Sequence, residues 1–175
     1  TVFLPHIMNQ GFKELCMVSP DTGGTKRAVS YSKWLECDFA IGYKQRVKAN
    51  EVESLQIIGD VVNKDVILID DIIDTGGTIC RAAQRIKELG AKSVMAMCTH
   101  AVLSDNAMDK LENSVLDKII VTDSIPLKRQ SSKFEVISVS YIFAEVIRSV
   151  LEHTSISSHF EVVKSVVEMA THPDQ

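Results

Sequence analysis

The chain has 175 residues, of which 45% are hydrophobic, and it carries a formal net charge of -4. This length and composition suffice for one domain with a substantial core, and we expect only one. The acidic balance provides no general electrostatic attraction to nucleic acid or to anionic lipid, so neither nucleic acid nor a membrane is expected as a partner.

The four cysteines are expected to be reduced thiols. They are Cys16, Cys37, Cys80 and Cys98. None belongs to a Cys-x-x-Cys pair, and two lie inside apolar, strand-like runs, which is typical of an intracellular protein without a disulfide or metal site. The sequence shows no signal peptide and no apolar run long enough to cross a bilayer, so a soluble cytoplasmic protein is the default expectation. Because the chain begins with Thr1 rather than Met, a fragment of a longer protein is expected.

The first predicted strand leads into a glycine turn and a helix. Residues 14–19 have the apolar content of a strand, and residues 28–37 have the composition of a helix. The turn at residues 20–27 reads Pro-Asp-Thr-Gly-Gly-Thr-Lys-Arg. Backbone N–H groups at a helix N-terminus can bind an anion, and two basic residues add positive charge here. We therefore predict an anion-binding loop, with an ordinary glycine turn as the alternative; its residues are Asp21, Thr22, Gly23 and Gly24.

Residues 38–43 are predicted as a second strand, and a basic segment follows it. Residues 44–50 read Lys-Gln-Arg-Val-Lys-Ala-Asn and show no apolar periodicity, so we predict a mobile loop. A charged loop of this kind is most often simply solvated, and its residues alone do not assign it a function.

The longest motif runs from residue 65 to residue 79. Residues 66–69 form a continuous apolar run, which is typical of a central parallel strand buried on both faces. Asp70 and Asp71 follow at its carboxyl end, and an Asp-Thr-Gly-Gly-Thr run then opens a helix that ends at Gly90. A helix N-terminus behind a glycine turn offers partial positive charge and free N–H groups. We therefore predict a phosphate-binding loop, with a simple helix cap as the alternative; its residues are Asp74, Thr75, Gly76, Gly77 and Thr78.

The remaining segments complete an alternating pattern. Further strands are predicted at residues 54–59, 91–98, 116–122 and 134–139. Strands that alternate with helices predict an α/β fold with a parallel sheet covered by helices on both faces. His100 follows a strand and is expected to be a hydrogen-bonded loop residue rather than a general base. Residues 140–153 are predicted as a helix whose apolar stripe packs into the core, namely Ile142, Phe143, Val146, Ile147, Val150 and Leu151.

Several of these motifs resemble those of class I ribose-phosphate pyrophosphokinases, the synthetases of phosphoribosyl pyrophosphate (PRPP). Residues 66–79 resemble the PRPP motif that these enzymes share with type I phosphoribosyltransferases. Residues 43–52, with a Lys-x-Arg pair followed by Ala-Asn, look like the flexible catalytic loop of the synthetases. Residues 154–160 are similar to their carboxyl-terminal Glu-Ser-Ile-Ser segment, with Thr154 in place of the usual acid. The resemblance implies a type I phosphoribosyltransferase-like parallel sheet with helices on both faces.

The resemblance covers only one of the two related α/β domains of the family. It extends from about Leu15 to Phe160 and matches the second domain. Residues 1–160 are therefore expected to form one phosphoribosyltransferase-like domain, and residues 161–175 an extension of unknown role. In the family the first domain supplies most ATP contacts and a magnesium-binding histidine. The resemblance thus implies an active parent enzyme and a fragment that is inactive alone.

The resemblance also implies a reaction. The family transfers pyrophosphate from ATP to the anomeric hydroxyl of ribose 5-phosphate, which gives PRPP and AMP for nucleotide biosynthesis. ATP and ribose 5-phosphate are the implied ligands and Mg2+ the implied cofactor. Lys44 and Arg46 would be catalytic and would stabilise developing negative charge. Arg46 would also contact ribose 5-phosphate, whose phosphate would lie on the 74–78 loop, while Asp70 and Asp71 would hold the ribose hydroxyls directly or through Mg2+.

The other motifs receive roles in the same way. Residues 21–24 would bind pyrophosphate, and Asp21 would hold Mg2+ near it. Ser155 and Ser157 would lie at a subunit interface that binds a regulatory phosphate or nucleotide, in a homo-oligomer of the hexamer-of-dimers type. For these serines the alternative is an N-cap cluster of a terminal helix.

Two other functions remain open. A PRPP-consuming phosphoribosyltransferase shares the central motif, but it does not explain the Lys-x-Arg pair at residues 44–46 or the Ser-Ile-Ser segment. A non-catalytic regulatory homologue of the synthetase should show eroded loops, whereas the Lys-x-Arg pair and the phosphate-binding loop are both intact in this sequence.

Overall fold

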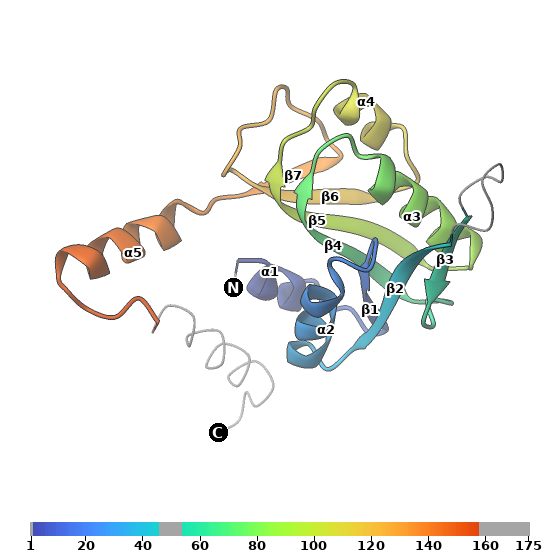
Figure 1. Ribbon diagram of the computed structural model, residues 1–175, viewed down its shortest axis with the longest axis horizontal. Coiled ribbons are helices and arrows are strands. Elements are labelled where there is room, and N and C mark those ends of the chain that lie inside the picture. Colours follow the sequence, from blue (N-terminus) through green and yellow to red (C-terminus); the bar gives the residue numbers. More distant parts are fainter. Residues whose placement is uncertain (1, 46–53, 158–175) are drawn as a thin grey trace.

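The chain folds into three layers, with a seven-stranded sheet between two layers of helices (Figure 1). This computed structural model describes residues 2–45 and 54–157. In chain order the elements are α1 (Phe3–Asn9), β1 (Leu15–Ser19), α2 (Thr25–Trp34), β2 (Asp38–Gln45), β3 (Ser54–Ile58), β4 (Asp65–Ile73), α3 (Gly77–Glu88), β5 (Ser93–Ala101), α4 (Ala107–Glu112), β6 (Lys118–Thr122), β7 (Phe134–Ile137) and α5 (Ser140–Leu151). The strands lie in the order β3-β2-β1-β4-β5-β6-β7, and neighbours are parallel except β2 and β3, which are antiparallel.

Side chains of the central strand β4 alternate between two cores. Val66 and Leu68 belong to one cluster, where α3 and α4 cover the sheet. Ile67 and Ile69 belong to the other cluster, where α1 and α2 cover it. All four side chains are at most 1% exposed. The predicted central strand buried on both faces is therefore confirmed, as is the α/β fold with helices on both sides of the sheet.

The helix α3 begins at the carboxyl end of β4 and packs as its periodicity predicts. The buried residues of its apolar stripe are Ile79, Ala82, Ala83 and Ile86. Gly90 follows the helix with φ of 93°, in the left-handed region that glycine adopts without strain, so the predicted stop is confirmed. This packing holds the N-terminus of α3 at the carboxyl edge of the sheet.

Truncation of a core residue in β4 tests this packing. Leu68→Ala is expected to lower the free energy of unfolding by about 2–5 kcal/mol, because it leaves a cavity in a close-packed core. Ile72→Ala is the matched control on the same strand. Its side chain is 49% exposed, so we expect a loss below about 1 kcal/mol. Urea unfolding followed by circular dichroism measures both variants, and equal losses would contradict the central position of Leu68.

Two neighbouring strands are longer than predicted. β4 continues through Ile73 and β5 through Ala101, because the two strands pair in parallel up to that point. The acid pair that follows the apolar run therefore lies within a strand rather than beyond its end. His100 also lies within a strand, and its Nδ1 is 3.0 Å from Ser124 Oγ. It is hydrogen-bonded as expected, but it is not a loop residue.

The strand β2 is longer than predicted as well. It continues through Gln45, because Lys44 pairs with Leu55 of the antiparallel strand β3. The prediction that a loop begins at Lys44 is therefore wrong, and this lysine is held by a strand pair. Residues 46–50, which include Arg46, lie outside the described part of the chain.

The helix α5 forms as predicted, but its apolar stripe does not pack into the core. Phe143, Ile147 and Val150 are 60%, 58% and 61% exposed. Figure 1 shows α5 projecting away from the sheet. Periodicity identifies which face of a helix is apolar, but it does not identify what covers that face, and here the described chain does not cover it.

The cysteines are unpaired in this fold. Cys16 and Cys98 are buried, and the other two are partly buried. Burial raises the pKa of Cys16 and of Cys98 to about 12, so both thiols stay protonated at neutral pH. Within residues 2–45 and 54–157, no helix is long and apolar enough to cross a membrane.

Candidate active site

The connections that follow the neighbouring strands β1 and β4 lead to opposite sides of this strand pair in the sheet. From β1 the chain passes through α2 to β2, and from β4 it passes through α3 to β5 on the other side. The carboxyl ends of parallel strands at such a switch point border a crevice in which ligands bind. Each Asp-Thr-Gly-Gly-Thr run follows one of these two strands, so both glycine loops lie at the same crevice.

A cavity of about 160 Å³ connects the two loops. Asp21 of the first loop and Asp70 of β4 line it together with residues 72–79. The fold thus gathers one acid of the first motif, one acid of the strand and the complete 74–78 loop around a single space.

The second loop takes its shape from the N-terminus of α3. Gly76 is the N-cap residue, with φ of 72°, and it packs against Leu111. No side chain caps this helix, so the interpretation of Asp74 and Thr75 as a simple cap is wrong. The first N–H groups of a helix have no intrahelical partner. Without a capping side chain they are left to a ligand or to water, as an anion site requires.

The first loop uses one of its donors internally. The Gly23 N–H donates to Asp21 Oδ1 over 2.9 Å. A Cβ at Gly24 would lie 2.6 Å from Ser19 Oγ, so a larger residue there would displace the hydroxyl that donates to the Asp21 carbonyl. In this conformation the Gly23 amide is satisfied by its own loop, and an anion would have to displace the Asp21 carboxylate to reach it.

Arg27 connects the first loop to the acid pair, a contact that the sequence did not predict. Its guanidinium nitrogens lie 3.2 Å from Asp70 Oδ1 and 2.8 Å from Asp71 Oδ2. The Asp71 N–H also donates to Asp70 Oδ1. Arg27 and Asp70 are 43 positions apart in the chain, so no local pattern reveals the ion pair.

The two acids differ in their electrostatic environment. Burial raises the pKa of the Asp70 carboxyl to about 6, and the Asp71 charge acts in the same direction. Desolvation opposes ionisation of Asp71 too, but the hydrogen bond with Asp70 and the Arg27 charge lower its pKa overall. Asp71 is therefore the stronger acid of the two, and Asp70 keeps its proton to a higher pH. Neighbouring carboxyls with separated pKa values are typical of functional sites.

The carboxylates at the crevice fit Mg2+ by donor type. Asp21 and Asp70 line the cavity, and carboxylate oxygens are ligands that Mg2+ takes together with water and substrate phosphates. Among the described residues, no group of three or more His, Cys, Asp or Glu side chains is arranged to hold a metal. A magnesium ion at this crevice would therefore need further ligands from water or a substrate.

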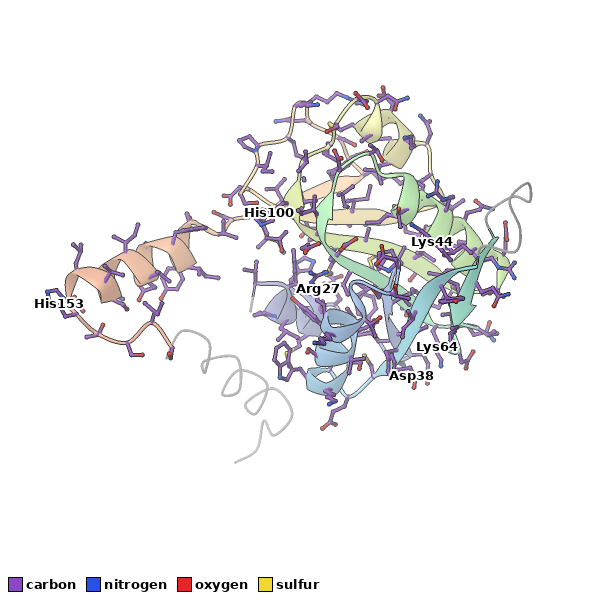
Figure 2. The ribbon with its side chains drawn as sticks, in the orientation of Figure 1. Arg27, Asp38, Lys44, Lys64, His100 and His153 are labelled. Carbon is purple, nitrogen blue, oxygen red and sulfur yellow. The ribbon has the colours of Figure 1, made fainter. Side chains whose placement is uncertain are left out.

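Three other described residues that the sequence predicts as site residues do not line the 160 Å³ cavity, namely Lys44, Ser155 and Ser157. Lys44 is exposed on β2 beyond Ile41, the last β2 residue that pairs with β1, so it lies on the carboxyl side of the sheet (Figure 2). Ser155 and Ser157 are exposed and follow α5, which projects away from the sheet (Figure 1). The structure therefore brings the two loops and the acid pair together, and it keeps the two serines apart from them.

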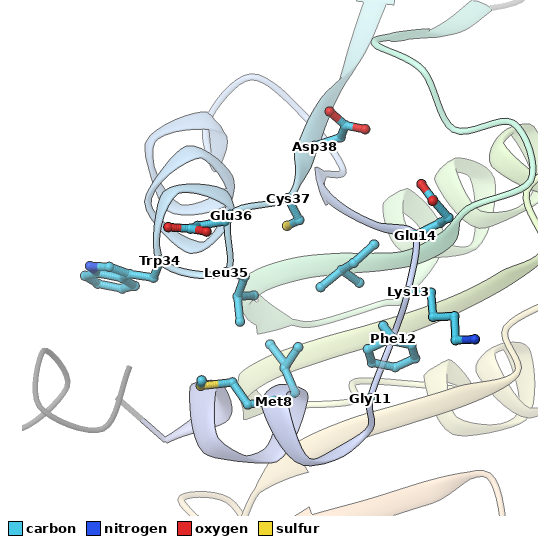
Figure 3. Close-up of a pocket in the computed structure, with 12 residues that line it drawn as sticks. Met8, Gly11, Phe12, Lys13, Glu14, Trp34, Leu35, Glu36, Cys37 and Asp38 are labelled. Carbon is cyan, nitrogen blue, oxygen red and sulfur yellow. The ribbon is translucent and has the colours of Figure 1, made fainter. Parts of the chain in front are cut away.

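A larger cavity, of about 520 Å³, lies between the ends of α1 and α2 and the starts of β1 and β2 (Figure 3). Met8, Phe12 and Leu35 provide its apolar walls, and Glu36 and Asp38 add acidic groups. It lies at the amino ends of the parallel strands, and neither Asp-Thr-Gly-Gly-Thr loop lines it. Because ligands bind at the carboxyl ends in this kind of sheet, we place the candidate active site at the smaller cavity.

Three features of this fold occur together: a mostly parallel sheet with a switch point, an acid pair in the central strand β4, and a glycine turn after β4 that opens a helix. Together they define an α/β domain of the type I phosphoribosyltransferase class. Comparison with known protein families identifies the family within this class. Residues 43–161 match the family described as the phosphoribosyl synthetase-associated domain, and the chain belongs to this family.

Individual relatives agree with this assignment. Ribose-phosphate pyrophosphokinase from Campylobacter jejuni is 54% identical over 159 residues, which cover 91% of this chain and 52% of that protein. Phosphoribosylpyrophosphate synthetase from Mycobacterium smegmatis has a crystal structure that matches with a TM-score of 0.75 and 34% identity, over 85% of this chain and 48% of that chain. Adenine phosphoribosyltransferase from Saccharomyces cerevisiae shares the fold, with a TM-score of 0.54 and 20% identity over 66% and 73% of the two chains. This chain spans about half the length of the curated relatives it matches.

Proposed function

We propose that this chain is the second α/β domain of a ribose-phosphate pyrophosphokinase, which transfers pyrophosphate from ATP to ribose 5-phosphate and gives PRPP and AMP for nucleotide biosynthesis. The observation that carries the proposal is the crevice at which two Asp-Thr-Gly-Gly-Thr loops meet beside an acid pair. This reaction must hold two phosphate-bearing groups, the sugar phosphate and the transferred pyrophosphate. One glycine loop for each matches that need. The names of the Campylobacter and Mycobacterium relatives support the same reaction.

The 74–78 loop would bind the phosphate of ribose 5-phosphate. The N-terminus of α3 offers N–H groups and partial positive charge, and the hydroxyls of Thr75 and Thr78 add donors. Asp70 and Asp71 would accept hydrogen bonds from the ribose hydroxyls. The Arg27 ion pairs support this role, because they hold both carboxylates in a fixed orientation.

The 21–24 loop would bind the transferred pyrophosphate, with Asp21 as a ligand of Mg2+. When bound, Mg2+ would neutralise charge on the phosphate oxygens. Lys44 and Arg46 would stabilise the charge that develops between the attacking and leaving oxygens. The position of Lys44 on the carboxyl side of the sheet supports its part in this role.

We further propose that the parent protein is a cytoplasmic homo-oligomer, with Ser155 and Ser157 at a regulatory subunit contact. The apolar face of α5, which the described part of the chain leaves exposed and which directly precedes these serines, supports burial against another protein surface. The four unpaired cysteines support a reducing compartment.

The activity of a completed enzyme tests the proposed reaction. The chain is joined to the remaining half of the Campylobacter jejuni relative, and AMP formation from ATP is followed with excess Mg2+. We expect equal amounts of AMP and PRPP, dependence on ribose 5-phosphate, and no turnover by the 175-residue chain alone. The intact Campylobacter jejuni protein is the control for the assay and for the added half.

Two outcomes would contradict the proposed reaction. A folded hybrid that binds ribose 5-phosphate but makes no AMP would favour a regulatory homologue. A hybrid that consumes PRPP when a nucleobase is present would favour a phosphoribosyltransferase.

A further inference from the structure

Three consecutive carbonyl groups, at the end of β4 and the start of the second loop, accept hydrogen bonds from one neighbouring segment, residues 103–110. The Leu103 N–H donates to the Ile73 carbonyl, and the Ser104 N–H donates to the Asp74 carbonyl, both over 3.1 Å. Lys110 Nζ donates to the Thr75 carbonyl over 3.0 Å. The 73–75 backbone is therefore held from one side by a segment that follows β5.

These contacts decide where the N–H groups of the loop point. The described chain has no cis peptide bond, and in a trans peptide the C=O and the following N–H point in opposite directions. The N–H groups of residues 74–76 therefore point away from the 103–110 segment. No residue of that segment lines the 160 Å³ cavity, whereas residues 74–76 do line it. The hydrogen bonds to the carbonyls of residues 73–75 thus orient the N–H groups of residues 74–76 toward the side where a ligand would bind.

Lys110 differs from the other two anchors because its contact depends on a side chain. Leu103 and Ser104 donate from the backbone, which any residue except proline could do. Lys110 lies on α4, and the next residue, Leu111, packs against Gly76, where an added Cβ would lie 3.1 Å from Leu111 Cγ. The helix α4 therefore fixes the Thr75–Gly76 peptide by a polar contact and by an apolar one.

The charge of Lys110 is not neutralised by the acids that flank it in the sequence. Asp109 and Glu112 both pair with Arg129 instead. An ammonium group that donates to a carbonyl also polarises the peptide, and this strengthens the N–H on the opposite side as a donor. Lys110 therefore adds positive charge behind the loop, and its contact strengthens the N–H that faces the ligand.

We propose that Lys110 is a positioning residue for the phosphate-binding loop. It holds the Thr75 carbonyl so that the Gly76 N–H faces the phosphate, without touching the ligand itself. The inference rests on the proposed binding of ribose 5-phosphate at the 74–78 loop. Lys110 lies outside every motif of the sequence that carries the proposed function.

Binding of ribose 5-phosphate to the 175-residue chain tests the inference by isothermal titration calorimetry. Lys110→Met removes the donor and the charge while it keeps the length of the side chain, and it is expected to raise the Kd about tenfold. Lys110→Arg restores a charged donor and is expected to stay within about threefold of wild type. Lys118→Met is the matched control, because Lys118 pairs with Glu135 at the amino end of β6, and its Kd is expected to be unchanged. Thermal unfolding midpoints of all four proteins should agree within a few degrees.

Each other outcome counts against the inference in a different way. If wild type binds and Lys110→Met binds equally well, Lys110 does not position the loop, and the proposed function is unaffected. If Lys110→Met and Lys110→Arg lose affinity and stability together, the lysine has only a structural role. If wild type does not bind ribose 5-phosphate, the proposed site fails and the role of Lys110 fails with it.

Discussion

Lys44→Ala in the completed enzyme is expected to lower kcat for AMP formation by at least about 100-fold and to leave the KM for ribose 5-phosphate nearly unchanged. Lys44 is assigned to charge that develops in the transition state, and loss of one focused charge typically costs roughly 3 kcal/mol of transition-state stabilisation. Steady-state AMP formation across a range of ribose 5-phosphate concentrations measures both constants.

Lys13→Ala is the matched control for this experiment. Lys13 is also an exposed lysine, but it lines the larger cavity at the amino ends of the strands. We expect it to change neither kcat nor KM. A Lys44→Ala enzyme that kept most of its turnover would remove Lys44 from the mechanism and leave the reaction class intact. A raised KM with unchanged kcat would assign the lysine to ground-state binding.

The central strand and both glycine loops could be predicted from the sequence, because each is encoded by adjacent residues. The apolar run at residues 66–69 has no polar position that could face solvent, so it belongs in the middle of a sheet. The Gly-Gly pairs mark tight turns directly before helical periodicity. Local chemistry of this kind needs no knowledge of the rest of the fold.

The ends of the strands and the surroundings of α5 could not be predicted, because they depend on partners. β4 extends past its apolar run through Ile73, since β5 supplies hydrogen bonds that far. Lys44 is part of a strand because the antiparallel strand β3 returns beside it. The apolar face of α5 looks like core in the sequence, but the described chain supplies no surface against it.

The contacts that organise the crevice could not be predicted either, because they join segments that lie far apart in the sequence. In the sequence Arg27 indicates only positive charge beside the first glycine loop. In the fold it pairs with Asp70 and Asp71, which belong to the second motif. Lys110 belongs to no motif at all, yet it holds the carbonyl of Thr75. The electrostatics of the site thus depend on which distant segments the sheet places side by side. Local patterns in a single sequence do not show which segments these are.

Gly76→Ala is expected to weaken ribose 5-phosphate binding to the 175-residue chain by at least about tenfold. Gly76 has φ of 72°, where a residue with a Cβ costs about 1–2 kcal/mol. The new Cβ would also lie 3.1 Å from Cγ of Leu111, which is fully buried and has little room to move. The loop must therefore shift, and its N–H groups lose their alignment with the phosphate.

Gly11→Ala separates this loss of alignment from backbone strain. Gly11 has φ of 65°, and nothing lies within 4 Å of an added Cβ, so alanine there introduces the same strain without a clash and far from the crevice. Urea unfolding is expected to show a loss of about 1–2 kcal/mol for Gly11→Ala and at least as large a loss for Gly76→Ala, whose Cβ also meets Leu111. Calorimetric titration should show weakened binding for Gly76→Ala alone. Affinity equal to wild type in Gly76→Ala would mean that this loop does not hold the phosphate, whereas parallel losses of affinity in both variants would trace the effect to stability.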